Sequence, residues 1–382
     1  DSLKDVLTNT DFVIISILPG TFIEMESDVH TPEKYGIYQS VGDSVGPGGL
    51  VRALRTIPMY VEIAEAIKDF APEAWVINYT NPMTLCTRTL YEIFPDIKAF
   101  GCCHEVFGTQ ELLAKMLADL EGIENVKRDE IKVNVKGINH FTWLDQATYQ
   151  DKDLFPLYKK FVDKYSETGF GEENEDYFSS KQRVKFDLFK RYGLIAAAGD
   201  RHLAEFCPKN WYLKNPDQVE QWKFALTPVV WRKNDKAEKV KKSSALINAD
   251  EKIELEASGE EGIRQIKSIL GLEEFITNVN LPNQGQIKGL SEGAVVETNA
   301  LFSRDSVKPV NAGELPENIQ SLVERHVLNQ ETILKAGLNK DKKLAFSAFV
   351  NDPLVDLDLK QAKKLFNEML INTKEYLSGW EI

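Results

Sequence analysis

The sequence predicts an α/β fold built on a doubly wound parallel sheet, followed by a second domain that is mostly helical. Three observations predict this class. Apolar runs of strand length occur at residues 11–18, 74–79 and 97–101. Helical patterns separate these runs, and strands that alternate with helices are typical of parallel sheets. Beyond about residue 151 the chain changes to longer, charged helical segments.

The first part of the chain contains the strands and helices of the predicted sheet. The run 11–18 is almost continuously apolar, as expected for a strand that is buried on both faces. Apolar residues recur at helical spacing over 53–70 and again over 83–94, and Pro82 suits the first turn of the second helix. Residues 131–137 alternate between apolar and polar side chains, which predicts a half-buried strand.

The later part of the chain predicts a mixed α+β domain that is mostly helical. Charged helices are expected over 154–165 and 180–192. Surface loops are expected over 167–177 and 258–262, where glycine and glutamate are frequent. From about residue 314 the pattern is helical almost throughout.

The front of the predicted sheet lacks one feature of a complete dinucleotide-binding unit. Such a unit begins with a strand and a Gly-x-Gly-x-x-Gly turn whose backbone N–H groups hold a pyrophosphate. The glycine-rich segment 42–49 precedes a helix but follows no clear strand. We therefore expect residues 1–140 to form a Rossmann-like, NAD-binding type of domain that is N-terminally truncated and lacks its first strand and glycine-rich turn. Residues 141–382 are expected to form the substrate-binding and catalytic domain.

Composition argues against several classes of partner. The 382 residues include 59 acidic and 46 basic side chains, a formal net charge of −13. Nucleic acids and anionic membranes reward clustered Lys and Arg, so neither is expected to be the main partner. No stretch approaches the roughly 20 apolar residues that a membrane-spanning helix needs. The four cysteines form no recognisable disulfide framework, which predicts a reduced, cytoplasmic setting.

Side chains with metal-binding chemistry follow two of the predicted strands. Cys102 and Cys103 come directly after the strand 97–101, and His140 follows the strand 131–137. Open α/β sheets bind ligands beyond the carboxyl ends of their strands, where a thiolate and an imidazole would suit zinc, manganese or iron. Two protein ligands leave coordination positions for a substrate. Adjacent residues of an extended segment point in opposite directions, so one of the two cysteines faces the site.

Five ordered motifs carry a resemblance to a known family. They are Val41–Gly49, Ile77–Met83, Gly101–Glu105, Gly137–Phe141 and Asn280–Gly285 with Ala294–Glu297. With these motifs the chain resembles the NAD- and manganese-dependent glycoside hydrolases of family 4 over essentially its whole length. Within the family it is most similar to the α-galacturonidase-type members, which carry Cys-His-Glu and Gly-Asp-Arg-His, here at 103–105 and 199–202.

The resemblance implies an enzyme that hydrolyses α-glycosidic bonds of α-galacturonides, or of a related α-uronide or α-hexoside. In this family NAD takes a hydride from carbon 3, and a metal polarises the resulting ketone. A base then removes the carbon-2 proton, the leaving group departs from carbon 1, water adds, and the cofactor returns the hydride. This route differs from the paired-carboxylate scheme of most glycosidases. The implied cofactors are NAD and manganese(II) or another divalent metal.

The same resemblance implies roles for four residues around the metal. The family pattern selects Cys103 over Cys102, so Cys103 and His140 are the expected ligands, with sugar hydroxyls completing the coordination. Asn81 and Asn139 are amides at strand ends that can both donate to and accept from sugar hydroxyls, so we expect them to bind the substrate.

The resemblance assigns the general acid and the general base less directly than it assigns the metal ligands. In α-acting members the acid is an aspartate after the metal cysteine; here that position is His104, which can also act as a general acid. The base of phospho-sugar members is a tyrosine, and the aligned segment here offers His202, with Asp200 to orient it or to act on its own. Glu105 could support the acid or simply begin a helix, and Tyr192 is an alternative base.

A uronide carries a carboxylate that requires a cation. Arg201 is the first choice, because a guanidinium group can hold a carboxylate with two parallel hydrogen bonds. Arg232 and Lys233 are weaker candidates.

Residues at the carboxyl ends of the first two strands are expected to border the cofactor. These are Ile17, Pro19, Asn78 and Pro82. An asparagine before a turn is commonly a local cap, which is an alternative role for Asn78. The expected partner is a small-molecule carbohydrate, and the family resemblance implies a homo-oligomer, either a dimer or a tetramer.

Two other functions share some of these features. An NAD-dependent 2-hydroxyacid dehydrogenase would have the same sheet, but it would need no metal-binding cysteine and would carry an intact glycine-rich turn. A catalytically inactive fragment that binds a sugar or a nucleotide would be consistent with the missing turn.

Overall fold

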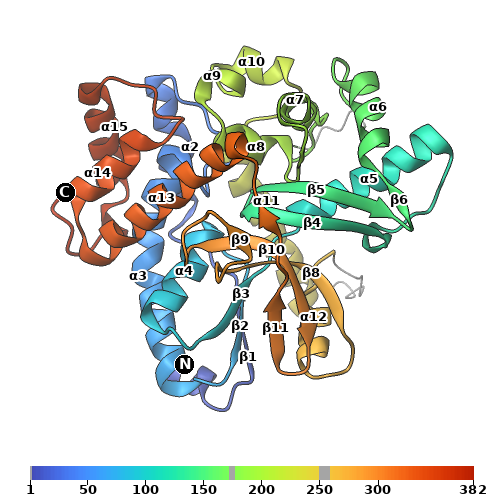
Figure 1. Cartoon of the computed structure of the whole chain (residues 1–382). Coiled ribbons are helices and arrows are strands. Elements are labelled where there is room, and N and C mark those ends of the chain that lie inside the picture. The colour runs from blue at the N-terminus through green and yellow to red at the C-terminus, as the bar shows by residue number, and fades with distance from the viewer. Residues whose placement is uncertain (1, 172–176, 249–258) are drawn as a thin grey trace.

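A six-stranded mixed sheet lies at the centre of the computed structural model, which describes residues 2–171, 177–248 and 259–382 (Figure 1). Its strand order is β1-β2-β3-β8-β10-β11. The strands are β1 (Phe12–Ile15), β2 (Trp75–Asn78), β3 (Lys98–Gly101), β8 (Phe275–Pro282), β10 (Val295–Ser303) and β11 (Ser306–Pro309). Strands β1 to β3 are parallel, whereas β8, β10 and β11 continue the sheet in antiparallel pairs. The predicted α/β class is confirmed, and the parallel part of the sheet is its first three strands.

Both faces of the sheet are covered at β2 and β3, which explains why these strands are mostly apolar. The edge strand β1 leaves Ile14 54% exposed, so the expectation that the run 11–18 is buried on both faces is wrong. Helices α3 (Gly46–Phe70) and α4 (Met83–Ile93) cover one face, where Tyr60 and Leu90 pack with Val76 and Ala99. Successive strand residues point to opposite faces. The neighbouring Ile77 and Phe100 accordingly belong to a second apolar cluster on the other face, beside α12 (Gly262–Ile269).

A second sheet packs beside the first and is built on a long hairpin. Strands β4 (Ile131–Ile138) and β5 (Phe141–Tyr149) pair in antiparallel fashion, with Ile138 opposite Phe141. Asn139 and His140 form the two-residue turn between them. The hairpin therefore crosses residue 140, and β8 and β10 return from the later part of the chain to the first sheet. The division of the chain at residue 140 stays a prediction.

The remaining elements complete the layers. Two short strands, β6 (Lys152–Asp153) and β7 (Ile195–Ala196), join β5, and β9 (Ile287–Lys288) pairs with β12 (Gly313–Glu314). The other helices are α1 (Leu3–Leu7), α2 (Phe22–His30), α5 (Glu105–Glu121), α6 (Phe155–Tyr165), α7 (Arg183–Tyr192), α8 (Asp200–Phe206), α9 (Lys209–Tyr212), α10 (Pro216–Gln221), α11 (Val229–Ile247), α13 (Glu317–Asn339), α14 (Lys342–Asn351) and α15 (Leu359–Asn372). The C-terminal helices α13 to α15 gather beside α2 and α3 (Figure 1).

The predicted elements recur in the structure with small shifts of their ends. The helices expected over 154–165 and 180–192 are α6 and α7, and the last part of the chain is helical as expected. Residues 172–176 of one predicted loop, and residue 258 of the other, lie outside the described residues. Gly262, the last residue of the second loop, begins α12. None of the helices in the described part of the chain is long and apolar enough to cross a membrane.

The glycine-rich segment forms the start of α3 and brings a polar loop close to it. Helix α3 begins at Gly46. A Cβ atom on Gly48 would lie 2.7 Å from the Asp28 carbonyl oxygen, and one on Gly49 would lie 2.4 Å from the Ser44 carbonyl carbon. Glycine is therefore required for this close approach, which holds the loop that carries Asp43 and Ser44 against the helix.

Candidate active site

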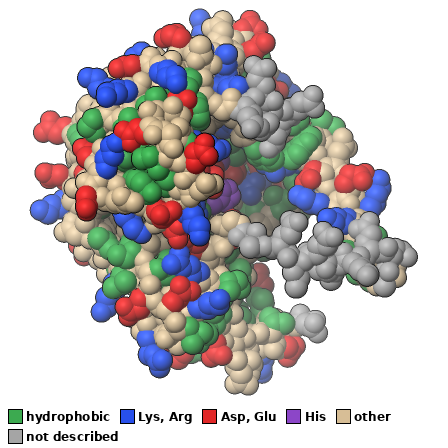
Figure 2. All heavy atoms as spheres, turned by 90° about the vertical axis from the view of Figure 1, so that its right-hand side faces the viewer, with side chains coloured by type: hydrophobic (Ala, Val, Ile, Leu, Met, Phe, Trp, Pro, Cys, Tyr) green, Lys and Arg blue, Asp and Glu red, His purple; other side chains and the backbone are tan. Residues whose placement is uncertain are grey.

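A cavity of about 630 Å³ opens at the carboxyl ends of β1, β2 and β3. Figure 2 shows histidine side chains in a hollow on this side of the molecule. The cavity is lined by strand-end residues together with most of the predicted site, among them Ser16, Tyr79, Asn81, Cys103, His104, Glu105, His140, Arg201 and His202. The topology explains this convergence, because parallel strands present their carboxyl ends at one edge of the sheet.

The hairpin turn presents His140 to the cavity in a defined tautomer. His140 is buried and has a φ of 65°, which non-glycine residues adopt uncommonly. The Ser44 hydroxyl donates to Asp43 Oδ1 at 2.8 Å and lies 3.0 Å from His140 Nδ1. A carboxylate only accepts hydrogen bonds, so Ser44 gives its proton to Asp43 and accepts the proton of Nδ1. Nε2 of His140 therefore keeps a free lone pair, which is the form that binds metals.

Electrostatics distinguish His140 from its neighbour His202. Burial, and then the charge of His202, lower the pKa of His140 to about 3, so His140 is neutral. Burial also acts to lower the pKa of His202, but Glu105 outweighs it and raises that pKa above its usual value. His202 Nδ1 lies 3.3 Å from Glu105 Oε1, while Glu105 Oε2 accepts the Gly199 N–H at 2.6 Å. His202 therefore accepts a second proton more readily than His140 does.

Asp43 joins these histidines in a group that could hold a metal. Asp43, His140 and His202 each offer one ligand atom, and these atoms lie within 4.8 Å of one another. The two imidazole rings lie close together, with centroids 3.8 Å apart and planes tilted by 32°. The neutral His140 is better suited to bind a metal than His202, whose pKa Glu105 raises.

The adjacent cysteines point to different surroundings. Both line the cavity, but the Cys102 thiol donates to Gln265 Oε1 at 3.1 Å and belongs to the apolar cluster that contains Phe100. Cys103 is also buried and lies outside the three-residue group described above. Burial and then the charge of Glu297 raise the pKa of the Cys103 thiol, so a bound cation is needed to form its thiolate. The assignment of Cys103 as a metal ligand stays a prediction.

The two predicted amides each present an unused acceptor. Asn81 Nδ2 donates to Asp43 Oδ2 at 3.1 Å, and Asn139 Nδ2 donates to Glu297 Oε2 at 3.2 Å. These bonds fix the orientation of both amides. The Oδ1 atoms of Asn81 and Asn139 are buried and have no hydrogen-bond partner among the described residues. Buried acceptors of this kind need a donor, and a sugar hydroxyl supplies one.

Two predicted residues bond to the fold itself. Asp200 is fully buried, and its Oδ1 accepts the Lys185 N–H at 3.1 Å in the first turn of α7. The carboxylate beside His202 Nδ1 is that of Glu105. Asp200 Oδ2 has no hydrogen-bond partner among the described residues, and the role of Asp200 as a base or an orienting residue stays a prediction. Asn78 accepts the Tyr60 hydroxyl at 2.5 Å and bonds to both the N–H and the C=O of Thr80. Its amide therefore acts as a local cap of the turn after β2, and its role at the cofactor stays a prediction.

Arg201 lines the cavity but cannot hold a carboxylate with two parallel bonds as expected. Its Nε donates to the Ala225 carbonyl oxygen at 3.1 Å, and its Nη2 donates to Ser40 O at 2.5 Å and to Thr227 Oγ1. The remaining nitrogen, Nη1, is the one that can face a ligand. Arg232 lines the same cavity, with its guanidinium group 4.6 Å from the ring centroid of Phe178. Lys233 forms an ion pair with Glu26.

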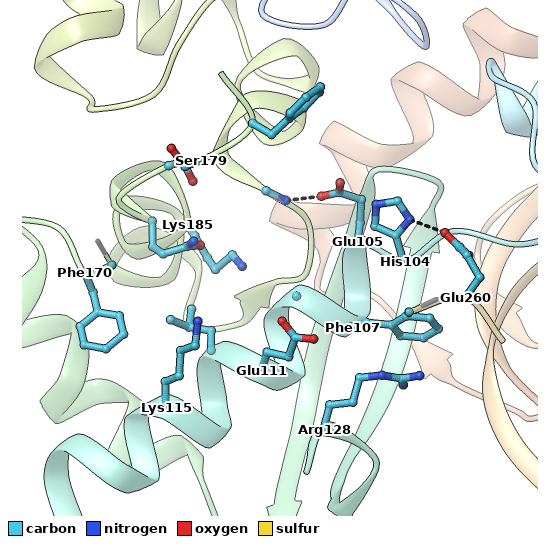
Figure 3. Close-up of a pocket in the computed structure, with 18 residues that line it drawn as sticks. His104, Glu105, Phe107, Glu111, Lys115, Arg128, Phe170, Ser179, Lys185 and Glu260 are labelled. Atoms are coloured by element: carbon cyan, nitrogen blue, oxygen red, sulfur yellow. Dashed lines mark hydrogen bonds and ion pairs between the residues drawn. The ribbon is translucent and has the colours of Figure 1, made fainter. Parts of the chain in front are cut away.

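His104 lies at the border between two cavities. Its imidazole is 66% exposed, and Nδ1 lies 3.0 Å from Glu260 Oε1. The second cavity, of about 610 Å³, shares His104, Glu105 and Glu260 with the first (Figure 3). Figure 3 shows that Lys115 and Glu111 project from α5 toward it.

Besides Asn81, the strand ends border the first cavity through residues that were not predicted from the sequence. Ile14, Ser16, Tyr79 and Met83 contribute to its lining, together with Ile263 of α12. The predicted Ile17, Pro19 and Pro82 lie within three positions of these residues in sequence and are not among the lining residues. Pro19 O accepts the Arg55 Nε–H at 2.9 Å. The role of these three residues at the cofactor stays a prediction.

Several functional candidates were missed by sequence reasoning. Asp43, Ser44 and Glu297 lie inside the motifs that carried the family resemblance, and that position was their available signal. The three are joined to the site through contacts with residues far away in the chain, which no local pattern shows.

Comparisons with known proteins identify the family of the chain. The family model described as "Family 4 glycosyl hydrolase" matches residues 1–119, and the model of its C-terminal domain matches residues 135–355. An α-galacturonidase of Thermoanaerobacterium saccharolyticum is 66% identical over all of this chain and 83% of the relative. The crystal structure of lplD from Bacillus subtilis is 55% identical and has a TM-score of 0.94, covering 97% of this chain and 85% of that one. A 6-phospho-α-glucosidase from gut microorganisms, crystallised with NAD and Mn²⁺, is 19% identical with a TM-score of 0.80, covering 98% of this chain and 83% of that one, and shares the fold.

Proposed function

This chain belongs to family 4 of the glycosyl hydrolases, and we propose that it hydrolyses α-galacturonides with NAD and a divalent metal ion, preferably Mn²⁺, as cofactors. The observation that carries the proposal is the 66% identity to an α-galacturonidase over the whole chain. The cavity is consistent with it, since it contains metal-binding, proton-transferring and sugar-binding groups within one space.

Cys103 and His140 are the proposed metal ligands. Both line the cavity, one on the loop after β3 and the other in the turn of the hairpin. Mn²⁺ prefers oxygen ligands to imidazole and thiolate. We therefore expect the carboxylate of Asp43 and the hydroxyl oxygens of the sugar to complete its coordination. When bound, NAD and the metal supply hydride transfer at carbon 3 and stabilise negative charge on the oxidised sugar.

Strand-end residues offer a fitting place for NAD. Ile14 is 54% exposed and Ser16 and Tyr79 line the same cavity, so an apolar surface with polar groups extends from the sheet to His140. Cofactor sites in open α/β sheets lie at this edge.

His202 is the proposed base at carbon 2. Glu105 holds its Nδ1, so Nε2 is directed away from Glu105 and can take a proton from the substrate. The carboxylate also stabilises the imidazolium that forms, as in other carboxylate–histidine pairs. Asn81 and Asn139 hold the sugar through their unused Oδ1 acceptors.

His104 is the proposed acid at the leaving group. His104 lies at the border of the two cavities (Figure 3), which supports a substrate whose galacturonosyl ring lies on the His140 side and whose leaving group lies in the second cavity. Phe107 and Phe170 offer aromatic faces there, and Lys115 offers a cation. The second cavity is within the size range of small-molecule sites, so the leaving group can be as large as another sugar.

Arg201 and Arg232 together are the proposed site for the substrate carboxylate. Arg201 contributes Nη1, and Arg232 adds a second guanidinium group at the same cavity. A carboxylate needs two hydrogen-bond donors, and Arg201 has one nitrogen left for it. Arg232 supplies the second donor.

The test is hydrolysis of an aryl α-galacturonide by the purified chain with and without NAD and Mn²⁺. Turnover that requires both supports the proposal, whereas NAD consumed in proportion to product identifies a dehydrogenase. Binding of sugar or nucleotide without turnover identifies an inactive binding protein. We also propose a cytoplasmic homo-oligomer, consistent with the four free cysteines, which cell fractionation and light scattering can check.

A further inference from the structure

We propose that Glu297 is a positioning residue that turns the carbonyl oxygen of Asn139 toward the sugar. The proposal rests on the proposed function, because it assigns Asn139 to substrate binding. Glu297 lies on β10, in the register position opposite Asn280 of β8, and it is 1% exposed. Strand β10 runs beside the hairpin that carries Asn139 in its turn (Figure 1).

The carboxylate of Glu297 joins two segments of the site. Its Oε2 accepts from Asn139 Nδ2 at 3.2 Å, and its Oε1 accepts from Asn278 Nδ2 at 2.6 Å. The Asn278 amide also donates to the carbonyl oxygen of Cys103 at 3.2 Å. One side chain thus fixes the turn beside His140 and, through Asn278, the backbone of the predicted cysteine ligand.

The carboxylate of Glu297 determines which way the neighbouring amide points. Asn139 directs its NH₂ group toward Glu297 Oε2 and its Oδ1 atom away. Burial raises the pKa of Glu297 to about 7, and the ionised form, which has acceptors only, keeps the amide in this orientation. The Oδ1 atom is buried and has no partner in the part of the chain that the structure describes. The arrangement therefore presents a single acceptor of fixed position to a sugar hydroxyl.

Packing alone does not explain a glutamate at this position. Burying a carboxylate is more costly than burying a glutamine of nearly the same shape, unless the negative charge is used by its neighbours. Both oxygens of Glu297 are used, and both accept from amides rather than from a cation. The role of the carboxylate is accordingly to orient the amides of Asn139 and Asn278.

The test exchanges the two functional groups. In Glu297→Gln the 2.6 Å bond from Asn278 retains the Gln oxygen at Oε1, so the new NH₂ group faces Asn139. The Asn139 amide then rotates, and its NH₂ group replaces the acceptor that met the sugar. KM for an aryl α-galacturonide should rise about tenfold, which corresponds to the loss of one hydrogen bond. The double variant Glu297→Gln/Asn139→Asp restores an acceptor on both sides, and its KM should return to within about threefold of the wild type.

A structural role alone does not predict this rescue. The control is Thr298→Val, a buried neighbour on the same strand whose side chain points to the opposite face; its KM should not change. An unchanged KM in Glu297→Gln, or a raised KM that the double variant fails to lower, overturns the proposal. If Glu297→Gln does not fold, the KM of the double variant decides alone: near the wild type it supports the proposal, and raised it refutes it. Absence of any wild-type hydrolysis would instead contradict the proposed function.

Discussion

The Ser44 hydroxyl lies 3.0 Å from Nδ1 of His140 while it donates to Asp43 at 2.8 Å. Ser44, on a loop almost 100 residues earlier in the chain, thus determines the tautomer of His140. Residues behind a metal ligand typically contribute 10–100-fold to metal affinity.

We expect Ser44→Ala to weaken Mn²⁺ binding by about 10-fold or more, because Nδ1 loses its acceptor and the ring loses its orientation. Titration of Mn²⁺ followed by electron paramagnetic resonance measures this directly. Ser303→Ala, on β10 away from the cavity, is the control. Equal Mn²⁺ affinity in Ser44→Ala and wild type would show that Ser44 does not orient a metal ligand.

Cys103→Ser should abolish metal-dependent hydrolysis while the fold remains intact. The expected loss of Mn²⁺ affinity exceeds the roughly 100-fold typical of residues behind a ligand, since a thiolate ligand itself is removed. Cys102→Ser is the matched control, because the Cys102 thiol is bonded to Gln265 instead. Full Mn²⁺ affinity in Cys103→Ser would assign the ion to Asp43, His140 and His202.

His202→Ala should suppress exchange of the carbon-2 proton of the substrate with solvent deuterium. The reason is that His202 is the imidazole whose proton affinity Glu105 increases. Proton NMR of the substrate during turnover in D₂O measures the exchange, with a loss of at least about 100-fold expected for a missing general base. Undiminished exchange would exclude His202. Tyr192→Phe, which alters the alternative base, should exchange normally.

Glu205 should make stability depend on pH between about 4.5 and 7. Burial raises the pKa of this carboxyl to about 7, and it accepts the Val41 and Gly42 N–H groups. A raised pKa means that the folded state holds the proton more tightly, so stability is present below the unfolded pKa of 4.5 and is lost as pH rises through 7.

The loss attributable to Glu205 is about 3 kcal/mol. Denaturant unfolding at pH 5 and pH 8 should therefore show a larger drop for the wild type than for Glu205→Gln, which cannot titrate. A parallel drop in both proteins would show that this carboxyl is not responsible.

Lys115→Gln should distinguish substrates by their leaving group. Lys115 projects toward the second cavity, which is the proposed place of the leaving group (Figure 3). We expect a several-fold higher KM for a disaccharide whose leaving sugar is a uronate, and an unchanged KM for a neutral aryl galacturonide. The ratio of the two KM values from parallel kinetics is the measurement. Equal changes for both substrates would place the leaving group elsewhere.

The strands were predictable because their chemistry is local. The runs that contain β1, β2 and β3 are mostly apolar, and side chains of β2 and β3 pack into apolar clusters on both faces of the sheet. The antiparallel continuation of the sheet by β8 and β10 was not predictable in the same way. Those strands lie about 170 residues after β3, and their place depends on how the later part of the chain packs back.

The sequence predicted residues that meet in one cavity but not the partners that surround them. His104, His140, Asn81 and Cys103, which follow predicted strands, line this cavity together with His202 of the Gly-Asp-Arg-His motif. Asp200 of the same motif bonds through Oδ1 to the first turn of α7. The carboxylate beside His202 is that of Glu105, which is distant in sequence.

The sequence by itself determined the fold class, the family and the residues that can bind a metal or transfer a proton, because apolar periodicity and motif order are properties of short segments. The tertiary structure alone decided which groups tune them: Ser44 and Asp43 at His140, Glu105 at His202, and Glu297 at Asn139. Each pair joins segments that are roughly 100 residues or more apart in the chain. Their contact depends on the packing of two sheets and a glycine-rich loop, and the tautomers, proton affinities and amide orientations of the site follow from that packing.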